Sequence, residues 1–462
     1  MNSPIDFNEL PAPPGWPIAG NLFQLKQDRI HLILEDWARK YGSFYRLRAA
    51  NRKALIIADH AGIMQVLKER PATFRRSKTI ESVMEDMGVT GLVSAEGEHW
   101  KRQRRLSMQA FNPAHLRSFF PQVVKVTRRL LNRWRAAASS GSAVDVQPEL
   151  SRYATDVTAG LAFGSDINTI EGSSDVVRHL NRIFPMIHSR VNTPIPYWRY
   201  VKLPADRSFD RALHDLHLAV DEFIAQARAR MRADPSLLER PANLIEALVA
   251  ARDAPDSGFT DDDVFGNVFS TLLAGADGTA NTIAWVVYFL CESPEWQRIV
   301  QKEADALLGD EDVLHDFDTF SIPFPNTDAV IQEAMRLKPA FPILLHESNV
   351  DTSIGNVRVP AGTIIVLLLR MVGLDPAVFP DAGHFTPARW LQPDADRTYL
   401  VPFGSGPRMC VGRPLAMQEL KMITTMVARN FTAARTTTTA VEERLEFSMR
   451  PLNFTVAFEH RR

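Results

Sequence analysis

Apolar residues recur every three or four positions along most of the chain, which is the spacing of one buried helix face. Long helices predicted from this pattern span residues 31–41, 114–138, 208–231 and 261–292. The longest begins after Thr260, with Asp263 three residues on, which is the pattern of a capping box. Helices are therefore expected to make up most of the fold.

Strand patterns are short and lie toward the two ends of the sequence. Runs rich in aliphatic and aromatic residues predict strands at 43–47, 54–58, 363–368 and 452–457. Proline makes 11–20 an extended entry segment, and turn residues predict loops at 253–258, 309–325 and 374–395. No internal repeat or shift in composition divides the sequence. The expected fold is mainly α with a small β region, built as a single domain over 1–462.

Composition narrows the class of protein. The 462 residues are 45% hydrophobic and 23% charged, with a formal net charge of -1, so a folded chain without a nucleic-acid partner is expected. Two cysteines, Cys291 and Cys410, are too few for a disulfide framework, which favours a reducing cytoplasmic location. Residues 1–10 contain no apolar run, so neither a signal peptide nor a membrane anchor is expected.

The segment 403–414, FGSGPRMCVGRP, carries the most chemical information. Three glycines allow tight turns and close approach of the backbone to a ligand, and Pro414 followed by the apolar run 415–427 predicts the start of a helix. Cys410 is thereby placed just before a helix N-terminus, where backbone N–H groups stabilise a thiolate. An isolated cysteine is more often a buried, inert residue, but these neighbours favour a thiolate that can bind iron.

The order Phe403-x-x-Gly406-x-Arg408-x-Cys410-x-Gly412 resembles the haem-binding signature of the cytochrome P450 family, in its soluble, bacterial type. The resemblance implies the P450 fold, with a long central helix across the haem. It also implies haem b, with Cys410 as the axial iron ligand and Arg408 at a haem propionate. Phe403, Gly406 and Ala274 are expected to contact the cofactor.

A Glu-x-x-Arg pair, Glu333 and Arg336, with Arg389 downstream resembles the family's charged trio. Residues i and i+3 share one helix face, where a buried trio can brace the core if every charge is paired. The same spacing occurs at Glu149/Arg152, Glu295/Arg298 and Glu459/Arg462, which are expected to be surface pairs. Only the copy at 333 lies upstream of both Arg389 and the cysteine segment.

Other positions match by resemblance alone. Trp100 and Arg104, at i and i+4, resemble a helix that supplies a propionate donor, although a core tryptophan beside a solvated arginine is the competing interpretation. His346 stands where the family often places a second propionate contact, and a surface-strand histidine is an equal alternative.

Residues 101–135 include ten Lys or Arg and no Asp or Glu. This asymmetry suggests a docking surface for an acidic electron-transfer partner, such as a ferredoxin or a flavin/iron–sulfur reductase. A reductase is not expected within the chain itself, because no flavin or iron–sulfur motif is present.

The middle of the long helix departs from the family pattern. Ala274, Gly275, Asp277 and Thr279 match the oxygen-activating helix, but Gly278 stands where the family has a threonine that helps deliver protons. Three explanations remain: Thr279 or water takes over, the substrate provides the hydroxyl, or Gly278 is an engineered change. The two interior glycines also predict either a distorted backbone or close helix packing.

Substrate contacts implied by the resemblance are nearly all apolar: Val83, Met84, Met87, Val89, Leu92, Leu273, Ala276, Asp277, Ala340, Phe341, Ile343, Leu344 and Phe447. Such a lining favours an apolar small molecule. The expected enzyme is a monooxygenase that inserts one oxygen atom from O2, by hydroxylation or epoxidation. A peroxide-driven or non-oxygenating haem enzyme is the alternative that Gly278 favours, and a haem-thiolate gas sensor or carrier is a third.

Overall fold

A computed structural model describes residues 4–50, 52–172, 174–193, 195–255 and 257–461. The chain forms two compact units. The sheet unit comprises Met1–Ile80, Ala329–Cys410 and Glu442–Arg450. The helical unit comprises Glu81–Asp328, Val411–Val441 and Pro451–Arg462. Each unit is thus assembled from segments that lie far apart in the sequence.

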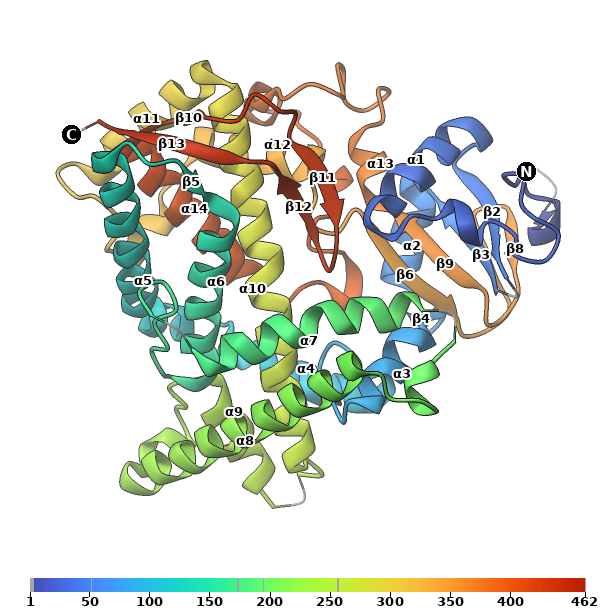
Figure 1. Ribbon diagram of the computed structural model, residues 1–462, viewed down its shortest axis with the longest axis horizontal. Coiled ribbons are helices and arrows are strands. Elements are labelled where there is room, and N and C mark those ends of the chain that lie inside the picture. The colour runs from blue at the N-terminus through green and yellow to red at the C-terminus, as the bar shows by residue number, and fades with distance from the viewer. Residues whose placement is uncertain (1–3, 51, 173, 194, 256, 462) are drawn as a thin grey trace. The chain divides into compact units, whose positions relative to one another are not determined.

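The sheet unit is built on a five-stranded sheet with the order β2-β3-β9-β6-β4. Its strands are β2 (Phe44–Ala49), β3 (Arg52–Ile57), β9 (Ile364–Leu368), β6 (Ile343–Ser348) and β4 (Phe74–Arg76). A smaller sheet has the order β1-β8-β7, with β1 (Ile5–Asp6), β8 (Val357–Val359) and β7 (Thr352–Ile354). These strands lie beside α1 and α2 in Figure 1.

Alternating side chains on the five-stranded sheet build two separate cores. One face packs on α1 (Ile30–Tyr41), where Leu34 meets Ile56 and Val366. The other face packs on α2 (His60–Lys68), where Val66 belongs to the same cluster as Leu55. Successive residues of a strand point to opposite faces, so a sheet covered on both faces needs nearly continuous apolar strands.

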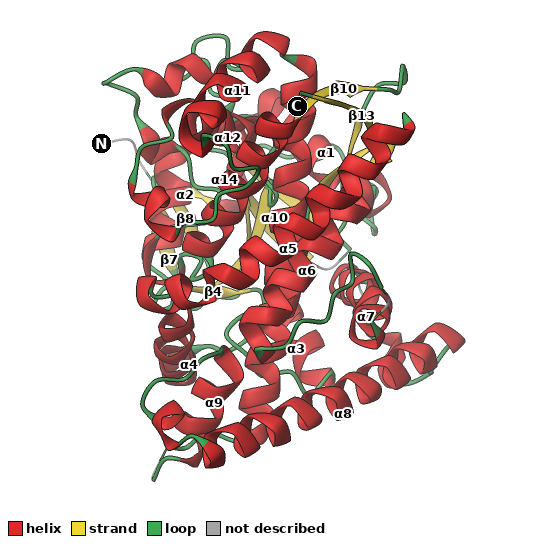
Figure 2. Ribbon diagram, turned by 90° about the vertical axis from the view of Figure 1, so that its left-hand side faces the viewer, coloured by secondary structure: helices red, strands yellow, loops and turns green. Residues whose placement is uncertain are grey.

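Long helices dominate the helical unit (Figure 2). They are α4 (Gly97–Ala110), α5 (Pro113–Ser140), α6 (Val146–Phe163), α7 (Asp175–Asn192), α8 (Pro204–Ala233), α9 (Leu244–Asp253), α10 (Asp261–Glu292), α11 (Pro294–Leu308) and α14 (Arg413–Asn430). Two shorter helices, α3 (Lys78–Asp86) and α12 (Pro325–Leu337), span the boundaries of the units, and α13 (Leu369–Gly373) belongs to the sheet unit. A small sheet has the order β10-β13-β5, from β10 (Phe431–Arg435), β13 (Thr455–His460) and β5 (Val144–Asp145).

The predicted helices are confirmed as α1, α5, α8 and α10. The bounds of α10 match the prediction, and its capping box is present, with Thr260 Oγ1 accepting from the Asp263 N–H. The run after Pro414 lies inside α14, as expected. Loop 309–325 contains one short 3-10 turn at Phe317–Ser321, and loop 374–395 contains another that begins at Pro387.

Three strand predictions correspond to β2, β3 and β9, and the fourth is wrong in its position. The run 452–457 is split between β12 (Met449–Leu452) and β13, because Asn453 has a φ of 58° and turns the chain between them. An apolar run alone does not mark such a turn, since the left-handed residue is a single asparagine. β12 pairs with β11 (Glu442–Leu445) in a separate hairpin.

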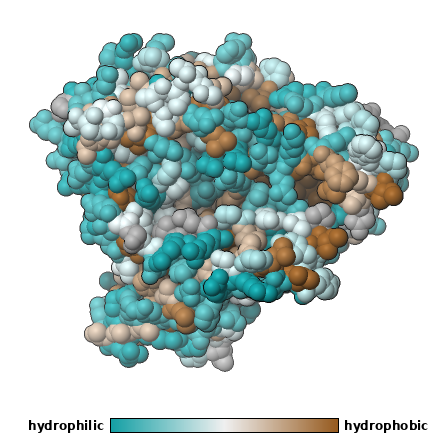
Figure 3. Space-filling model, viewed as in Figure 1, coloured by the Kyte–Doolittle hydropathy of each residue, from teal (hydrophilic) through white to brown (hydrophobic). Residues whose placement is uncertain are grey.

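The surface drawn in Figure 3 is mostly hydrophilic, with hydrophobic residues in separate patches. Within the described ranges, no helix combines the length and apolar character needed to span a lipid bilayer.

Candidate functional site

Cys410 lies at the end of a tight loop in the sheet unit. The Cys410 N–H donates to the carbonyl oxygen of Phe403 at 2.9 Å, which closes the loop, and the cysteine is exposed. Gly406 has a φ of 71°, and a Cβ there would lie 2.5 Å from the carbonyl oxygen of Leu67 at the end of α2. Only glycine satisfies both the left-handed backbone and this close approach. The loop thus presents a thiol shortly before α14 begins at Arg413, as the sequence predicts.

The second cysteine has a different environment. Cys291 lies near the end of α10, and burial raises the pKa of its thiol to about 12. Such a thiol stays protonated at neutral pH and is a poor metal ligand. The two cysteines are therefore chemically distinct, and Cys410 is the candidate ligand.

His346 is buried in β6 within a group of cationic side chains, which we call the His346 group: His346, Arg70, Arg76 and Arg408. Burial, followed by the positive charges of Arg70, Arg76 and Arg408, holds the pKa of His346 well below its usual range. Arg76 lies directly across from His346 in the pairing of β4 with β6. His346 is therefore neutral and buried, not the surface histidine that the sequence left as an alternative.

The His346 group fits an anionic carboxylate group such as a haem propionate. The Nδ1 atom of His346 is buried and has no hydrogen-bond partner among the described residues. A neutral imidazole can donate from this nitrogen to a carboxylate, and the arginines supply the compensating charge. Sequence reasoning found His346 and Arg408 but missed Arg76, which strand pairing brings beside His346, and Arg70, which lies in the turn between α2 and β4.

Glu333, Arg336 and Arg389 form the predicted charged trio, which we call the Glu333 cluster. Arg336 donates to both carboxylate oxygens of Glu333, at 2.8 and 2.7 Å, and Arg389 Nε donates to Glu333 at 3.1 Å. The remaining Arg336 donors reach three carbonyl oxygens, those of Gly373, Ala382 and His384. Both Glu333 and Arg336 are fully buried. Every donor of the guanidinium is satisfied, which is the condition for a stable buried charge.

The other Glu-x-x-Arg copies differ from this one in their exposure and ion pairs. Glu295 and Arg298 are exposed, as expected. The expectation of a surface pair is wrong for Glu149, because its carboxylate is buried and accepts from both Arg152 and Arg133. Arg462 lies outside the described residues, so the copy at 459 is not placed.

The helical unit carries the remaining predicted cofactor contacts. Trp100 is buried on α4, and the guanidinium of Arg104 lies 5.7 Å from the centre of its ring, so the two share a helix face. Ala274 is exposed in the middle of α10. Their roles toward a cofactor stay predictions.

Gly275, one of the interior glycines of α10, is explained by helix packing. A Cβ on Gly275 would lie 2.5 Å from Oγ1 of Thr158 on α6, so close packing of two helices requires glycine there. The alternative of a distorted backbone is not needed at this position, since α10 is an uninterrupted α-helix.

Polar groups beside Gly278 are linked to one another. The Asn281 side chain donates to Asp277 at 3.3 Å, and its oxygen accepts from Gln147 on α6. The carbonyl oxygen of Gly278 accepts from the Thr282 hydroxyl at 2.7 Å, and Thr279 is buried. Asp277 is therefore held on the side of α10 that faces α6.

The predicted substrate residues divide between the units. Val83, Met84, Met87, Val89, Leu273 and Ala276 are buried in the helical unit, and Leu92 there is half-buried. In the sheet unit, Phe341 and Phe447 meet edge to face at 5.7 Å. Ile343 packs on the α1 side of the sheet and Leu344 on the α2 side, so these two cannot share one pocket at the sheet.

Several positive charges of the basic segment 101–135 form ion pairs with acidic residues from elsewhere in the chain. Arg117 pairs with Asp318, and Lys125 and Arg129 both pair with Asp166. Arg133 and Arg135 pair with Glu149 and Asp312. The expectation of an unbalanced positive surface is wrong for this part of α5, because acids from distant segments lie beside it.

Comparison with known proteins identifies the family. The sequence profile of the cytochrome P450 family matches residues 10–458. A cyclooctat-9-en-7-ol 5-monooxygenase from Streptomyces melanosporofaciens is 28% identical over 422 residues, covering 90% of this chain and 88% of that protein. Cytochrome P450 27C1 from Danio rerio is 26% identical over 428 residues, covering 87% and 77%. The chain belongs to the cytochrome P450 family.

The fold agrees with that assignment. The crystal structure of a cytochrome P450DA heme domain superposes with a TM-score of 0.86 at 21% sequence identity, covering 100% of this chain and 99% of the other. A self-sufficient cytochrome P450 monooxygenase from Oidiodendron maius is 27% identical over 91% of this chain, and the match covers 39% of that protein. The protein is a P450 monooxygenase, an oxidoreductase whose family binds haem through a cysteine thiolate.

Proposed function

We propose that both units form a single haem domain that inserts one oxygen atom from O2 into an apolar small molecule, by hydroxylation or epoxidation. The observation that carries the proposal is the exposed Cys410 in a glycine-dependent loop, in the same unit as the buried, cationic His346 group. A soft thiolate and a carboxylate-binding group are what a haem requires from its protein.

Cys410 would ligate the iron of haem b, and the His346 group would hold its propionates. Trp100 and Arg104 of α4 would contribute further propionate contacts, with Phe403, Gly406 and Ala274 against the macrocycle. A thiolate-bound haem supplies oxygen activation, because the thiolate pushes electron density toward the iron and favours O–O cleavage.

Asp277, Gly278 and Thr279 would govern proton delivery. Asp277 is oriented by Asn281, whereas Gly278 offers no hydroxyl at the usual position. Thr279 is the nearest hydroxyl in sequence, and a substrate hydroxyl is the other candidate donor. The Streptomyces relative is named for an alcohol substrate, which favours testing alcohols as well as hydrocarbons.

The haem assignment is tested by the spectrum of the reduced protein under carbon monoxide. A thiolate-ligated haem gives a strongly red-shifted Soret band, and Cys410→Ser is expected to abolish that shift. Cys291→Ser is the matched control and should leave the spectrum unchanged, since the Cys291 thiol stays protonated. An unaltered spectrum in Cys410→Ser contradicts the assignment.

The reaction type is tested by the share of reducing equivalents that ends as hydrogen peroxide, in the present chain and in Gly278→Thr. Less peroxide and more oxygenated product in the variant would support an ordinary monooxygenase tuned by Gly278. General acid catalysis is typically worth about 10²–10⁴-fold, so the effect should be measurable. Faster turnover with added peroxide than with O2 and electrons would favour the peroxide-driven alternative.

An acidic electron donor, a ferredoxin or a flavin/iron–sulfur reductase, is proposed to dock near 101–135. Fewer basic residues support this docking site than the sequence suggests. The two that carry the proposal are Arg102 and Arg105, which are exposed on α4. Arg102→Glu with Arg105→Glu should raise the KM for a ferredoxin, whereas Arg117→Gln should not. Equal KM values in both variants would place the donor elsewhere. A cytoplasmic location is part of this proposal.

A further inference from the structure

The β11–β12 hairpin docks on the segment that follows α12 through three separate contacts. Glu443 forms an ion pair with Lys338. The Met449 N–H donates to the carbonyl oxygen of Ala340 at 2.8 Å. Phe447 at the turn meets Phe341 edge to face, with ring centres 5.7 Å apart. The docking of the whole hairpin thus holds the two aromatic rings together.

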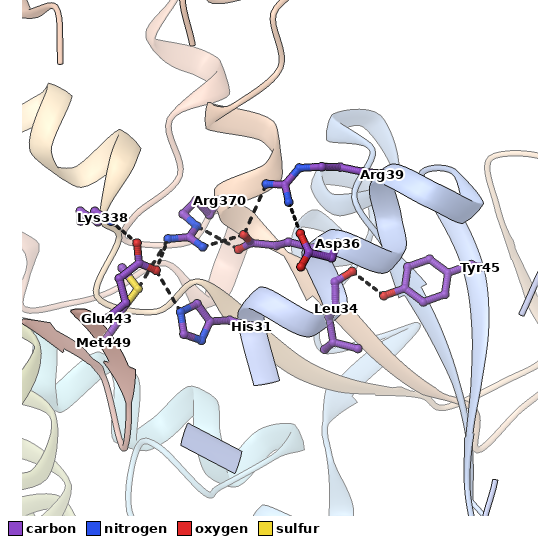
Figure 4. Close-up of polar contacts among 10 residues, drawn as sticks. His31, Leu34, Asp36, Arg39, Tyr45, Lys338, Arg370, Glu443 and Met449 are labelled. Carbon is purple, nitrogen blue, oxygen red and sulfur yellow. Dashed lines mark hydrogen bonds and ion pairs between the residues drawn. The ribbon is translucent and has the colours of Figure 1, made fainter. Parts of the chain in front are cut away.

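Glu443 joins this hairpin to three other segments, as Figure 4 shows. Besides Lys338, its carboxylate accepts from Arg370 of α13 at 2.5 Å and lies 3.1 Å from Nε2 of His31 on α1. Arg370 is in turn bidentate to Glu35 of α1, at 2.9 and 2.6 Å. We call these five residues the Glu443 network. Glu443 is the one member that belongs to the hairpin.

A third cation, Arg39, lies at the edge of the Glu443 network. Two carboxylates, Glu443 and Glu35, face two cations, Lys338 and Arg370, and Arg39 lies 4.0 Å from Glu35. His31 completes the set through its Nε2 atom, which lies 3.1 Å from the Glu443 carboxylate. Removal of the Glu443 charge would therefore take away the carboxylate that faces both Lys338 and Arg370.

Electrostatics agree with a fixed carboxylate. Burial alone would raise the pKa of Glu443, but His31, Arg370 and Lys338 outweigh it and hold the pKa well below its usual range. Burial lowers the pKa of Lys338, and Glu443 opposes that change. Lys338 and Glu443 therefore keep each other charged inside the unit.

Phe341 and Phe447 are both half-buried, so each ring keeps an accessible surface besides the one that faces its partner. We propose that Glu443 is a positioning residue: it anchors the β11–β12 turn so that Phe447 stays on Phe341 and the pair presents a rigid aromatic surface to the substrate. This inference rests on the proposed function, in which both phenylalanines are substrate contacts.

The test uses the haem-loaded protein and two iron ligands, imidazole and 4-phenylimidazole, titrated by the shift of the Soret band. Only 4-phenylimidazole carries an aromatic ring that can pack on a pocket wall. An edge-to-face contact is worth about 0.5–1.5 kcal/mol, so Glu443→Gln and Phe447→Ala should each raise its dissociation constant up to about tenfold. The dissociation constant for imidazole should stay within about twofold of the original value.

A neighbouring carboxylate provides the matched control. Glu442 precedes Glu443 on β11, but its half-exposed side chain pairs with Arg29 instead. Glu442→Gln should leave both ligand affinities unchanged. In the double variant, Phe447→Ala should add little to Glu443→Gln, because both act through one aromatic pair. Hydrogen exchange in 442–450 should be faster in Glu443→Gln, which reports on the turn even if the variant loses stability.

Two results would overturn the inference. One is an unchanged 4-phenylimidazole affinity in Glu443→Gln, and the other is equal weakening of both ligands, which would indicate a general disturbance. A chain that binds haem without the thiolate spectrum would instead overturn the proposed function, and this inference with it. The carbon monoxide spectrum of the unaltered protein separates the two failures.

Discussion

The sheet unit contains two buried charge clusters that are assembled in different ways. In the Glu333 cluster, the central pair is i and i+3 on one helix, and backbone carbonyls satisfy every remaining arginine donor. In the Glu443 network, α1, α13, the segment after α12 and the β11–β12 hairpin each contribute side chains. The first cluster completes a local pattern, whereas the second ties distant segments together, and its His31 Nδ1 atom has no hydrogen-bond partner among the described residues.

The Glu333 cluster and the Glu443 network therefore have different structural roles. Because every donor of Arg336 is already used, the Glu333 cluster can only hold its surroundings rigid. A network that includes a hairpin turn can instead control where that turn lies. The following variants test the contrast, from the largest expected effect to the smallest.

Arg336→Met should have the largest effect. It leaves Glu333 buried without its bidentate partner, and loss of one partner of a buried ion pair typically costs about 3–5 kcal/mol. Urea unfolding should show a free energy of unfolding lower by that amount, or no folded protein. Arg298→Met is the control, because Arg298 belongs to an exposed Glu-x-x-Arg pair and should change little. A small loss of unfolding free energy in Arg336→Met would mean that the two clusters contribute equally to stability.

Glu443→Gln should cost less, about 1–3 kcal/mol. The amide keeps the shape and some hydrogen bonds, and the side chain of Lys338 is 22% exposed, so water can stabilise its ammonium group. Thermal and urea unfolding measure the loss. A cost as large as that of Arg336→Met would show that the hairpin anchor is as essential to folding as the Glu333 cluster.

Acid should reduce the difference in free energy of unfolding between the unaltered protein and Glu443→Gln. Because the folded-state pKa of Glu443 lies below the ordinary glutamate value of 4.5, its charge stabilises the fold above that pH. This stabilisation is lost as the pH falls below 4.5 toward the folded-state pKa. Urea unfolding at pH 7 and pH 4 should therefore give a larger gap between the two proteins at pH 7. A gap that widens on acidification would contradict the depressed pKa.

Asp36→Asn should have the smallest effect. Asp36 pairs with Arg39 at the exposed edge of the same region, and the two side chains are 73% and 53% exposed. Exposed pairs contribute about 0.2–1 kcal/mol, so the free energy of unfolding should change by less than about 0.5 kcal/mol. A loss above about 1 kcal/mol would show that the exposed pair of Asp36 and Arg39 contributes to stability as a buried pair does.

Long helices and the Glu333 cluster were accessible from the sequence because they depend on short spacings. A period of 3.6 residues defines α10, and the i, i+3 spacing defines the pair of Glu333 and Arg336. The Cys410 loop was accessible for the same reason, since its glycines and the following helix start lie within twelve residues. Strand 452–457 failed because a single asparagine turns the chain inside an apolar run.

The sequence by itself determined the family, the candidate iron ligand and the local charged pair, since each depends on residues near one another in the chain. Only the tertiary structure decided which charges meet. It placed Arg70 and Arg76 beside His346, paired Arg129 with Asp166, and brought Glu443 onto His31 and Arg370. The physical reason is that electrostatic interactions depend on distance in space, and the segments concerned lie tens to hundreds of residues apart along the chain.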